Sequence, residues 1–148
     1  MAASNWRVSA AVVLGLALIA VPMIALPKPD DFLAEYQRLA TMEGKDIRLF
    51  NESLRRWQAK QITDEQYADI LEQQILPPWR DERQAMEKLR VAREQTAKKQ
   101  LLLEYLTDRE QGWQLTIDGL RANDADRLRQ GAQKETDAQN VAAKLRGR

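Results

Sequence analysis

The stretch QITDEQY, residues 61–67, carries the clearest signal for the fold of this chain. Thr63 is a preferred N-cap residue, and Gln66 stands three positions later, where its side chain can bond back to the cap. This capping box predicts that one helix ends near Lys60 and that the next begins at Asp64. Because so short a turn leaves successive helices side by side, the stretch indicates an antiparallel helical hairpin.

The helix before this turn carries an apolar stripe at helical spacing. Its members recur at three or four residues, which is typical of a face buried against a partner; they are Tyr36, Leu39, Ile47, Phe50, Leu54 and Trp57. Glu43 falls on the continuation of the same stripe. Because glutamate is seldom fully buried, we expect Glu43 to tilt toward the rim of the core.

The helix after the turn meets two prolines, in the sequence LPPW from Leu76 to Trp79. Pro77 and Pro78 lack N–H donors and disfavour the helical conformation of the residues before them, so a straight helix is not expected to pass. One interpretation is a kink or one-turn break, with Pro78 in the first turn of a new segment and Trp79 covering the core edge. The alternative is an accessible surface for a partner.

The second half of the chain predicts two further helices. An unbroken helix from Pro78 to Leu120 would rise about 65 Å, so we place a bend or turn in Arg93–Gln100. Asn123 or Asp124 is expected to cap the last helix. Its face is built from small residues that bury little area, so it is predicted to be the least stable helix; the face comprises Ala125, Leu128, Ala132, Ala138, Ala142 and Leu145.

Together these signals predict an all-α bundle of about four helices in two antiparallel hairpins. The expected helices cover residues 31–60, 64–93, 97–121 and 124–146. Three of the four tryptophans occupy core-facing positions in them, at Trp57, Trp79 and Trp113.

The N-terminal region carries a strong membrane signal. Val8–Leu26 contains no charged residue and spans about 28 Å as a helix, close to the thickness of a hydrocarbon core. Trp6 and Arg7 stand at its start, where an indole and a positive charge are common interface anchors. A cleaved signal peptide is the alternative, but cleavage after Ala20 or Ala25 would not follow a small-x-small pattern, which favours an uncleaved anchor.

These observations divide the chain into three parts. Residues 1–26 are expected to form a transmembrane signal anchor, residues 27–30 a stiff stalk with two prolines, and residues 31–148 the bundle. A short N-terminal flank usually stays inside, so the bundle is expected on the periplasmic side of a bacterial inner membrane.

Composition excludes much chemistry. The 148 residues include no cysteine and no histidine, which removes disulfides, thiol nucleophiles, the common metal ligand and histidine-based triads. The Glu-x-x-His motif of a ferritin-like di-metal site is absent, so no metal or cofactor is expected. Arg7 precedes the apolar run, and the remaining basic residues balance the 22 acidic ones, which argues against a nucleic-acid partner.

One resemblance covers much of the bundle. Ile62–Leu89, ITDEQYADILEQQILPPWRDERQAMEKL, followed by Leu101–Leu128, LLLEYLTDREQGWQLTIDGLRANDADRL, resembles helical extramembrane regions of some bacterial rhomboid-type membrane proteins. In those proteins a Leu-Pro-Pro-Trp break precedes a charged helix. Rhomboid proteolysis needs a multi-helix membrane core with serine and histidine, which this chain lacks. The resemblance therefore implies a shared accessory module and no protease activity.

The leading hypothesis is a non-enzymatic, membrane-anchored accessory or scaffolding subunit. It would contact the lipid bilayer and another membrane protein or complex, or self-associate, with a partner surface predicted at Pro77, Pro78 and Trp79 and supported by Trp57. The alternative is an exported sensor that holds a small apolar or aromatic ligand between helices, lined by Tyr36, Trp57, Tyr105 and Trp113. A carboxylate-based hydrolase has no defensible pair of acids in the sequence.

Overall fold

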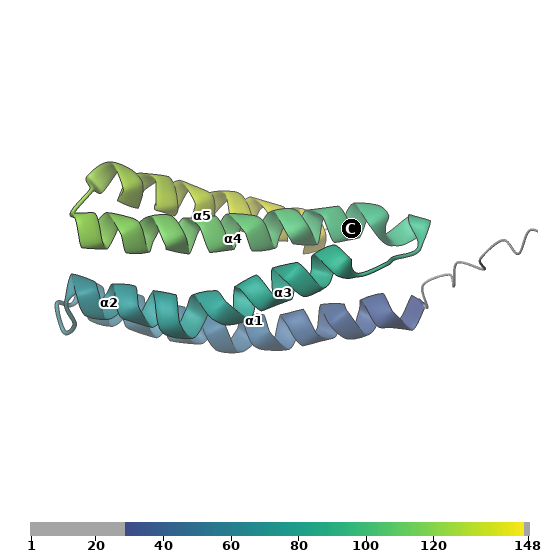
Figure 1. Ribbon diagram of the computed structural model, residues 1–148, viewed down its shortest axis with the longest axis horizontal. Coiled ribbons are helices and arrows are strands. Elements are labelled where there is room, and N and C mark those ends of the chain that lie inside the picture. The colour runs from purple at the N-terminus through teal and green to yellow at the C-terminus, as the bar shows by residue number, and fades with distance from the viewer. Residues whose placement is uncertain (1–28, 147–148) are drawn as a thin grey trace, which may run out of the picture.

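The computed structural model describes residues 29–146, and within this range the chain is helical apart from its turns. In chain order the elements are α1 (Pro29–Gln58), α2 (Asp64–Ile70), the π-helix η1 (Leu71–Ile75), α3 (Leu76–Lys88), the 3₁₀ turn η2 (Arg93–Gln95), α4 (Thr96–Ala122) and α5 (Ala125–Arg146). Two helical hairpins lie against each other, one of α1 with α2–η1–α3 and one of α4 with α5 (Figure 1). The predicted all-helical architecture is confirmed.

The turn between α1 and α2 forms as the sequence predicts. Thr63 Oγ1 accepts a hydrogen bond from the Gln66 amide at 3.2 Å, and the Thr63 amide donates to Gln66 Oε1 at 2.9 Å. Lys60 adopts a left-handed conformation with φ of 57°, which ends α1. The indole of Trp57 donates to Asp64 Oδ1 at 2.7 Å and ties the two sides of the turn together.

The two prolines do not break the second helix, because a π-helical turn precedes them. In η1 the Leu76 amide bonds to the carbonyl of Leu71, five residues earlier. A proline ring clashes with the carbonyl four residues before it in a regular helix, and the wider turn relieves this clash. Pro77 and Pro78 then fall in the first turn of α3, as expected for Pro78.

The break between the second and third helices lies slightly earlier than predicted. α3 ends at Lys88, where Leu89 turns to an extended conformation with ψ of 125°, and η2 precedes α4. The break therefore covers residues 89–95 instead of 93–100. Lys99, in the polar run that follows, donates to the carbonyls of Glu87 at 3.0 Å and Leu89 at 2.5 Å, so the side chain of α4 caps the end of α3.

Asn123 and Asp124 have different roles at the turn between α4 and α5. Asn123 takes the left-handed conformation that ends α4, with φ of 50°. Asp124 Oδ1 accepts from the amides of Asp126 at 2.9 Å and Arg127 at 3.2 Å, so Asp124 is the cap of α5.

Glycines bring α4 and α5 into close contact. A Cβ on Gly131 would lie 2.9 Å from the Gly112 carbonyl oxygen and 2.7 Å from Thr116 Oγ1, and one on Gly119 would lie 3.0 Å from Leu128. The two backbones therefore approach as closely as glycine permits. The buried residues of α5 are Gly131, Ala138 and Val141, whereas Ala125 and Ala132 of the predicted small-residue face are exposed.

The apolar stripe of α1 is only partly used by the core. Phe32, Leu39, Asp46 and Ser53, spaced seven residues apart, are the buried positions of this helix. The predicted stripe members from Ile47 to Trp57 are half-buried instead. The sequence thus identifies an apolar face of α1 but not the direction in which that face points.

None of the helices within residues 29–146 is long and apolar enough to cross a membrane. The predicted anchor, together with Trp6, Arg7 and most of the stalk, lies outside the described residues.

Candidate functional site

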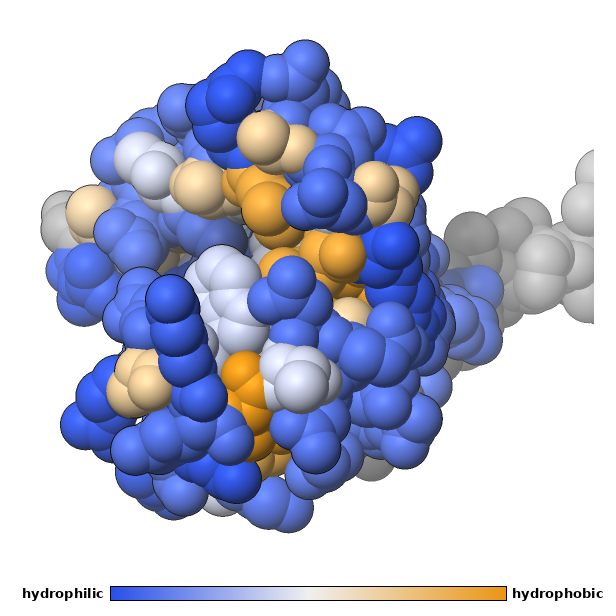
Figure 2. Space-filling view, turned by 90° about the vertical axis from the view of Figure 1, so that its left-hand side faces the viewer, coloured by the Kyte–Doolittle hydropathy of each residue, from blue (hydrophilic) through white to orange (hydrophobic). Residues whose placement is uncertain are grey.

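The seam between the first and the last helix of the bundle is open. No Cα atom of α1 lies within 8 Å of one in α5, although α5 packs along α4 and α1 packs on α2, η1 and α3. A cleft of about 610 Å³ occupies this seam. Seen end-on, apolar residues gather between the two hairpins beside a hollow on the left of the view (Figure 2).

Aromatic side chains line the inner part of the cleft. Trp57 stacks on Tyr67 with ring centroids 5.2 Å apart and 18° between the planes. Phe50 packs against Trp113 at 5.7 Å. Tyr67 and Trp113 are fully buried, whereas Phe50 and Trp57 are half-buried and complete the wall on α1. Burial raises the pKa of Tyr67, so its phenol is neutral at physiological pH.

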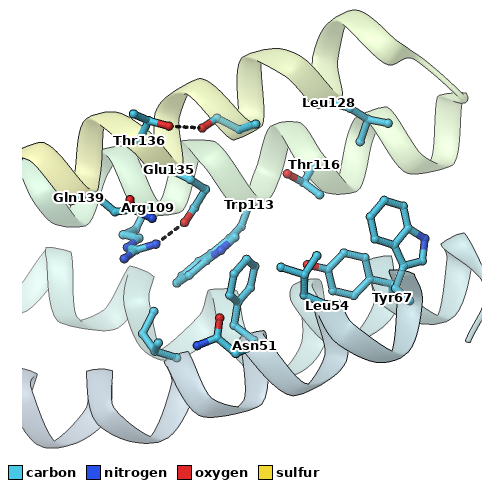
Figure 3. A pocket seen from close by; sticks show the side chains of 14 residues that line it. Asn51, Leu54, Tyr67, Arg109, Trp113, Thr116, Leu128, Glu135, Thr136 and Gln139 are labelled. Carbon is cyan, nitrogen blue, oxygen red and sulfur yellow. Dashed lines mark hydrogen bonds and ion pairs between the residues drawn. The ribbon is translucent and has the colours of Figure 1, made fainter. Parts of the chain in front are cut away.

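The opposite wall comes from α5 and is mostly small or uncharged. Leu128, Ala132, Thr136 and Gln139 line the cleft from this helix. Figure 3 shows Leu128 and Gln139 on this side and Asn51 on α1. This combination of a mainly apolar lining with a few polar groups is typical of binding sites, and it offers no nucleophile activated by a base.

A chain of polar contacts crosses the inner end of this cleft. The Tyr105 hydroxyl on α4 donates to the carboxylate of Glu43 on α1. Arg109 donates to the Tyr105 oxygen through Nε at 3.3 Å and forms an ion pair with Glu135 on α5. These four residues connect the two outer helices through α4. Glu43 is half-buried, as expected for a residue at the rim.

The charges of this bridge are held in place by burial and by one another. Burial raises the pKa of Tyr105, and the neighbouring Glu43 adds to the effect. Burial likewise raises the pKa of Glu135, although Arg109 opposes the shift. Burial alone would lower the pKa of Arg109, but Glu135 and Tyr105, through their charges and hydrogen bonds, together raise it, so Arg109 remains a cation. The bridge is therefore built to order three helices.

A smaller cleft of about 190 Å³ continues the seam on the other side of the bridge. Tyr36, Leu39 and Ala40 line it from α1, and Ala142 and Leu145 line it from α5. The aromatic residues named for a ligand site are thus divided between two clefts. Trp57 and Trp113 belong to the larger one, and Tyr36 and Tyr105 to the smaller one.

The structure does not bring the predicted partner residues together. Trp79 is 0% exposed and packs edge-on against Trp113 at 4.9 Å, so its indole is not a surface for a partner. Pro77 is exposed, and Pro78 is half-buried and lines a groove beside Met42 and Leu49 of α1. Trp57 alone faces the open seam. The packed interpretation of the Leu-Pro-Pro-Trp stretch therefore agrees with the geometry.

Two carboxylates are buried where α1 meets α3. Glu82 is 2% exposed, and its Oε2 lies 3.1 Å from the Arg38 guanidinium. Glu82 Oε1 and Asp46 Oδ2 have no hydrogen-bond partner within the described residues. Burial raises the pKa of Glu82 to about 7, and burial also raises that of Asp46. This interface therefore holds buried carboxylate oxygens without a partner in the described part of the chain, as is also true of Glu135 Oε1 on α5.

The surface acids of α2 and η1 surround a cation instead of a vacant site. Arg121 on α4 forms ion pairs with Glu65 at 3.0 Å, Asp69 at 2.9 Å and Glu72 at 2.8 Å. Arg121 lowers the pKa of Glu72. Within residues 29–146 no group of three or more acids is arranged to hold a metal ion.

Several residues of the seam were not identified from sequence. Arg109 and Glu135 look like ordinary surface charges at helical spacing, and only the packing of α4 on α5 brings them together. Gly112 and Gly119 stand seven residues apart on α4, a spacing that marks one helix face. Together with the small-residue face of the last helix, that spacing is a signal that predicts the close α4–α5 contact.

Comparison of the chain with protein-family models, curated proteins and solved structures found no match.

Proposed function

We propose that this chain is a non-enzymatic, membrane-anchored helical module that docks onto another membrane protein or complex through the α1–α5 seam. The open seam is the single observation that carries the proposal. Three half-buried apolar side chains of α1, Phe50, Leu54 and Trp57, line a cleft that α5 does not close.

Energetics support a binding role for this surface. Apolar area left in contact with water forgoes about 25 cal/mol per Å² that a partner can recover. α1 has buried polar residues at Asp46 and Ser53 while its apolar stripe lines the cleft. A helix that evolved only to close the bundle would be expected to place its apolar face inward.

The predicted anchor supplies the second part of the proposal. The apolar run Val8–Leu26 ends shortly before α1 begins, so α1 would start close to the bilayer surface. Confinement to the membrane raises the concentration of the module near a membrane partner and reduces the cost of association. The resemblance to extramembrane regions of rhomboid-type proteins is compatible with such an accessory role.

The test is affinity isolation of the full-length protein from native membranes in mild detergent, followed by mass spectrometry and light scattering. Ala132→Trp places an indole in the cleft from an exposed position, and Gln130→Trp places one on the outer face of the same helix. We expect stoichiometric recovery of one membrane complex with the parent and Gln130→Trp, and loss of that complex with Ala132→Trp. Equal recovery with both variants would contradict docking in the seam.

A second function is favoured by the size of the larger cleft. A volume of about 610 Å³ lies within the range of small-molecule sites, and stacked aromatics suit an apolar or aromatic ligand. If the isolated protein is a monomer or homodimer without a partner, a ligand-binding bundle becomes the better hypothesis. Organic extraction of the purified chain, followed by mass spectrometry, would then identify a bound compound.

A further inference from the structure

We infer that the occupant of the α1–α5 seam is an amphipathic helix of a partner protein, with an acidic edge that lies over Arg48 and Arg55. This inference rests on the proposed docking function and specifies the chemistry of the partner. It is carried by the extent of the apolar line on α1 and by the charges along the two lips of the seam.

The apolar line is too long for a compact ligand. It covers the wall of both clefts from Tyr36 to Trp57, about 30 Å of helix, and passes over the polar bridge. Leu33, the large apolar residue that is 56% exposed, lies seven residues before Ala40 and hence on the same face. A helix of about 20 residues matches this length, and its side chains at every third or fourth position can enter the clefts.

The two lips of the seam differ in charge. On α1, Arg48 and Arg55 lie beside the cleft residue Asn51, and neither forms an ion pair within the described residues. Glu52 shares their shallow groove without pairing to them. Among the other arginines of residues 29–146, four also form no ion pair, and seven are paired, which are Arg38, Arg80, Arg83, Arg109, Arg121, Arg127 and Arg129.

On the α5 side of the larger cleft the one acid, Glu135, is already paired with Arg109, and Arg146 lies at the smaller cleft. The other residues of this lip are uncharged and exposed; they are Ala132, Thr136 and Gln139. Small side chains let another helix approach closely on this side. A partner helix is therefore expected to set its small or apolar residues against α5 and its carboxylates against α1.

Charge also argues against a second copy of this chain. A symmetric dimer that joined two seams through α1 would bring Arg48 and Arg55 of one copy toward the same residues of the other, and like charges disfavour such pairing. Residues seven apart on a helix lie about 10 Å apart along its axis, so two acids at heptad spacing on a partner would match the two arginines.

The test uses two labelled synthetic helices with the full-length protein in detergent micelles. Both helices have about 18 residues with leucines at heptad spacing, and they differ in carrying either two glutamates or two lysines seven residues apart on one edge. Fluorescence anisotropy measures their affinities. We expect the glutamate helix to bind about tenfold more tightly at low salt, and the preference to shrink as salt rises.

Matched variants locate the interaction. The double variant Arg48→Glu with Arg55→Glu is expected to reverse the preference between the two helices, whereas Arg56→Glu, an exposed charge elsewhere on α1, should leave it unchanged. Ala132→Trp and Thr136→Trp should each weaken binding of the glutamate helix, with far-UV circular dichroism confirming that the fold is kept.

Each other outcome overturns the inference in a recognisable way. Equal affinities, or tighter binding of the lysine helix, would refute the acidic edge. Binding that persists in Ala132→Trp would place the helix outside the seam. A dimer in light scattering that Ala132→Trp dissociates would identify a second copy as the occupant. If neither helix binds while Ala132→Trp still abolishes recovery of the membrane complex, the helix inference fails and the docking function stands.

Discussion

The two hairpins of this bundle are packed on different principles. In the α4–α5 hairpin, glycines allow the backbones to touch, and a Cβ at Gly131 would meet the Gly112 carbonyl at 2.9 Å. In the other hairpin, the contact of α1 with α3 contains the buried acids Asp46 and Glu82, and α1 leaves its aromatic stripe half-exposed. The backbones of α4 and α5 are in close contact, whereas α1 is incompletely covered.

This difference connects packing with function. Backbone contact through glycine leaves no space between α4 and α5 for a third element. The interface of α1 with α3 contains two buried carboxylates, and the seam toward α5 is open, so α1 is the helix whose surroundings a partner can complete. Interactions that bind a partner are expected on such low-stability elements, because a fully packed helix has little left to gain.

The largest expected effect is the difference in stability between losing a tryptophan of the core and losing one at the seam. Trp79 is fully buried against Trp113 and Tyr105, so Trp79→Ala should reduce the free energy of unfolding by about 3–5 kcal/mol. Trp57 is half-buried and its loss should cost about 1–2 kcal/mol. Urea unfolding followed by circular dichroism measures both. Equal costs would show that the seam is packed as tightly as the core.

The next test concerns the glycine contact. Gly131→Ala adds a methyl group that must displace the Gly112 carbonyl or Thr116, so we expect a loss of about 2–3 kcal/mol in stability. The same measurement at several urea concentrations should show an unchanged dependence on denaturant, because the unfolded state is not altered. A neutral or stabilising result would mean that α4 and α5 lie farther apart than described.

Local signals in the sequence account for most helix ends. The capping box at Thr63 and the caps around Asn123 depend on residues within a few positions, so they can be recognised without the tertiary structure. Pro77 and Pro78 likewise predict from local sequence alone that a regular α-helix does not pass this point. The π-turn that accommodates the two prolines consists of residues with no distinctive pattern. The sequence therefore predicts a kink and gives no indication of a π-turn.

The candidate site was harder to predict because it depends on which helices fail to meet. Periodicity identifies the stripe around Phe50 and Leu54 as apolar, but a stripe facing a core and one facing an open seam have the same spacing. The bridge from Glu43 to Glu135 joins residues far apart in the chain, and no local rule pairs them. The two prolines beside Trp79 leave a packed and an accessible indole both open from sequence, and only the tertiary structure shows that this side chain is buried.

A pH titration should distinguish the two hairpins by the acid between α1 and α3. The pKa of Glu82 is raised by burial from near 4.5 to about 7, so its stabilising contribution is complete below about pH 4.5 and is lost as pH rises through 7. Glu82→Gln removes this titration and should raise stability at pH 8 by about 1–2 kcal/mol relative to the parent.

The control for this titration is Asp81→Asn, an exposed neighbour on the same helix that should not alter the pH profile. Hydrogen exchange adds a spatial readout, since amides of α1 should lose protection between pH 6 and pH 8 more than those of α5, after correction for intrinsic rates. If Glu82→Gln and the parent respond identically to pH, the interface of α1 with α3 is more polar than the described contacts imply.

The smallest expected effect has the opposite sign and comes from a glycine on α1. Gly44 lies in the middle of that helix, and a Cβ there would find only Arg48 Nη1, at 3.9 Å. Because glycine costs about 0.5–1 kcal/mol relative to alanine inside a helix, Gly44→Ala should stabilise the protein by that amount. Thermal unfolding of Gly44→Ala beside Gly131→Ala compares one chemical change in both hairpins. If α1 is open on its outer face and α5 is not, Gly44→Ala should raise the melting temperature and Gly131→Ala should lower it. A lower melting temperature for both variants would mean that a neighbour already covers α1 at Gly44.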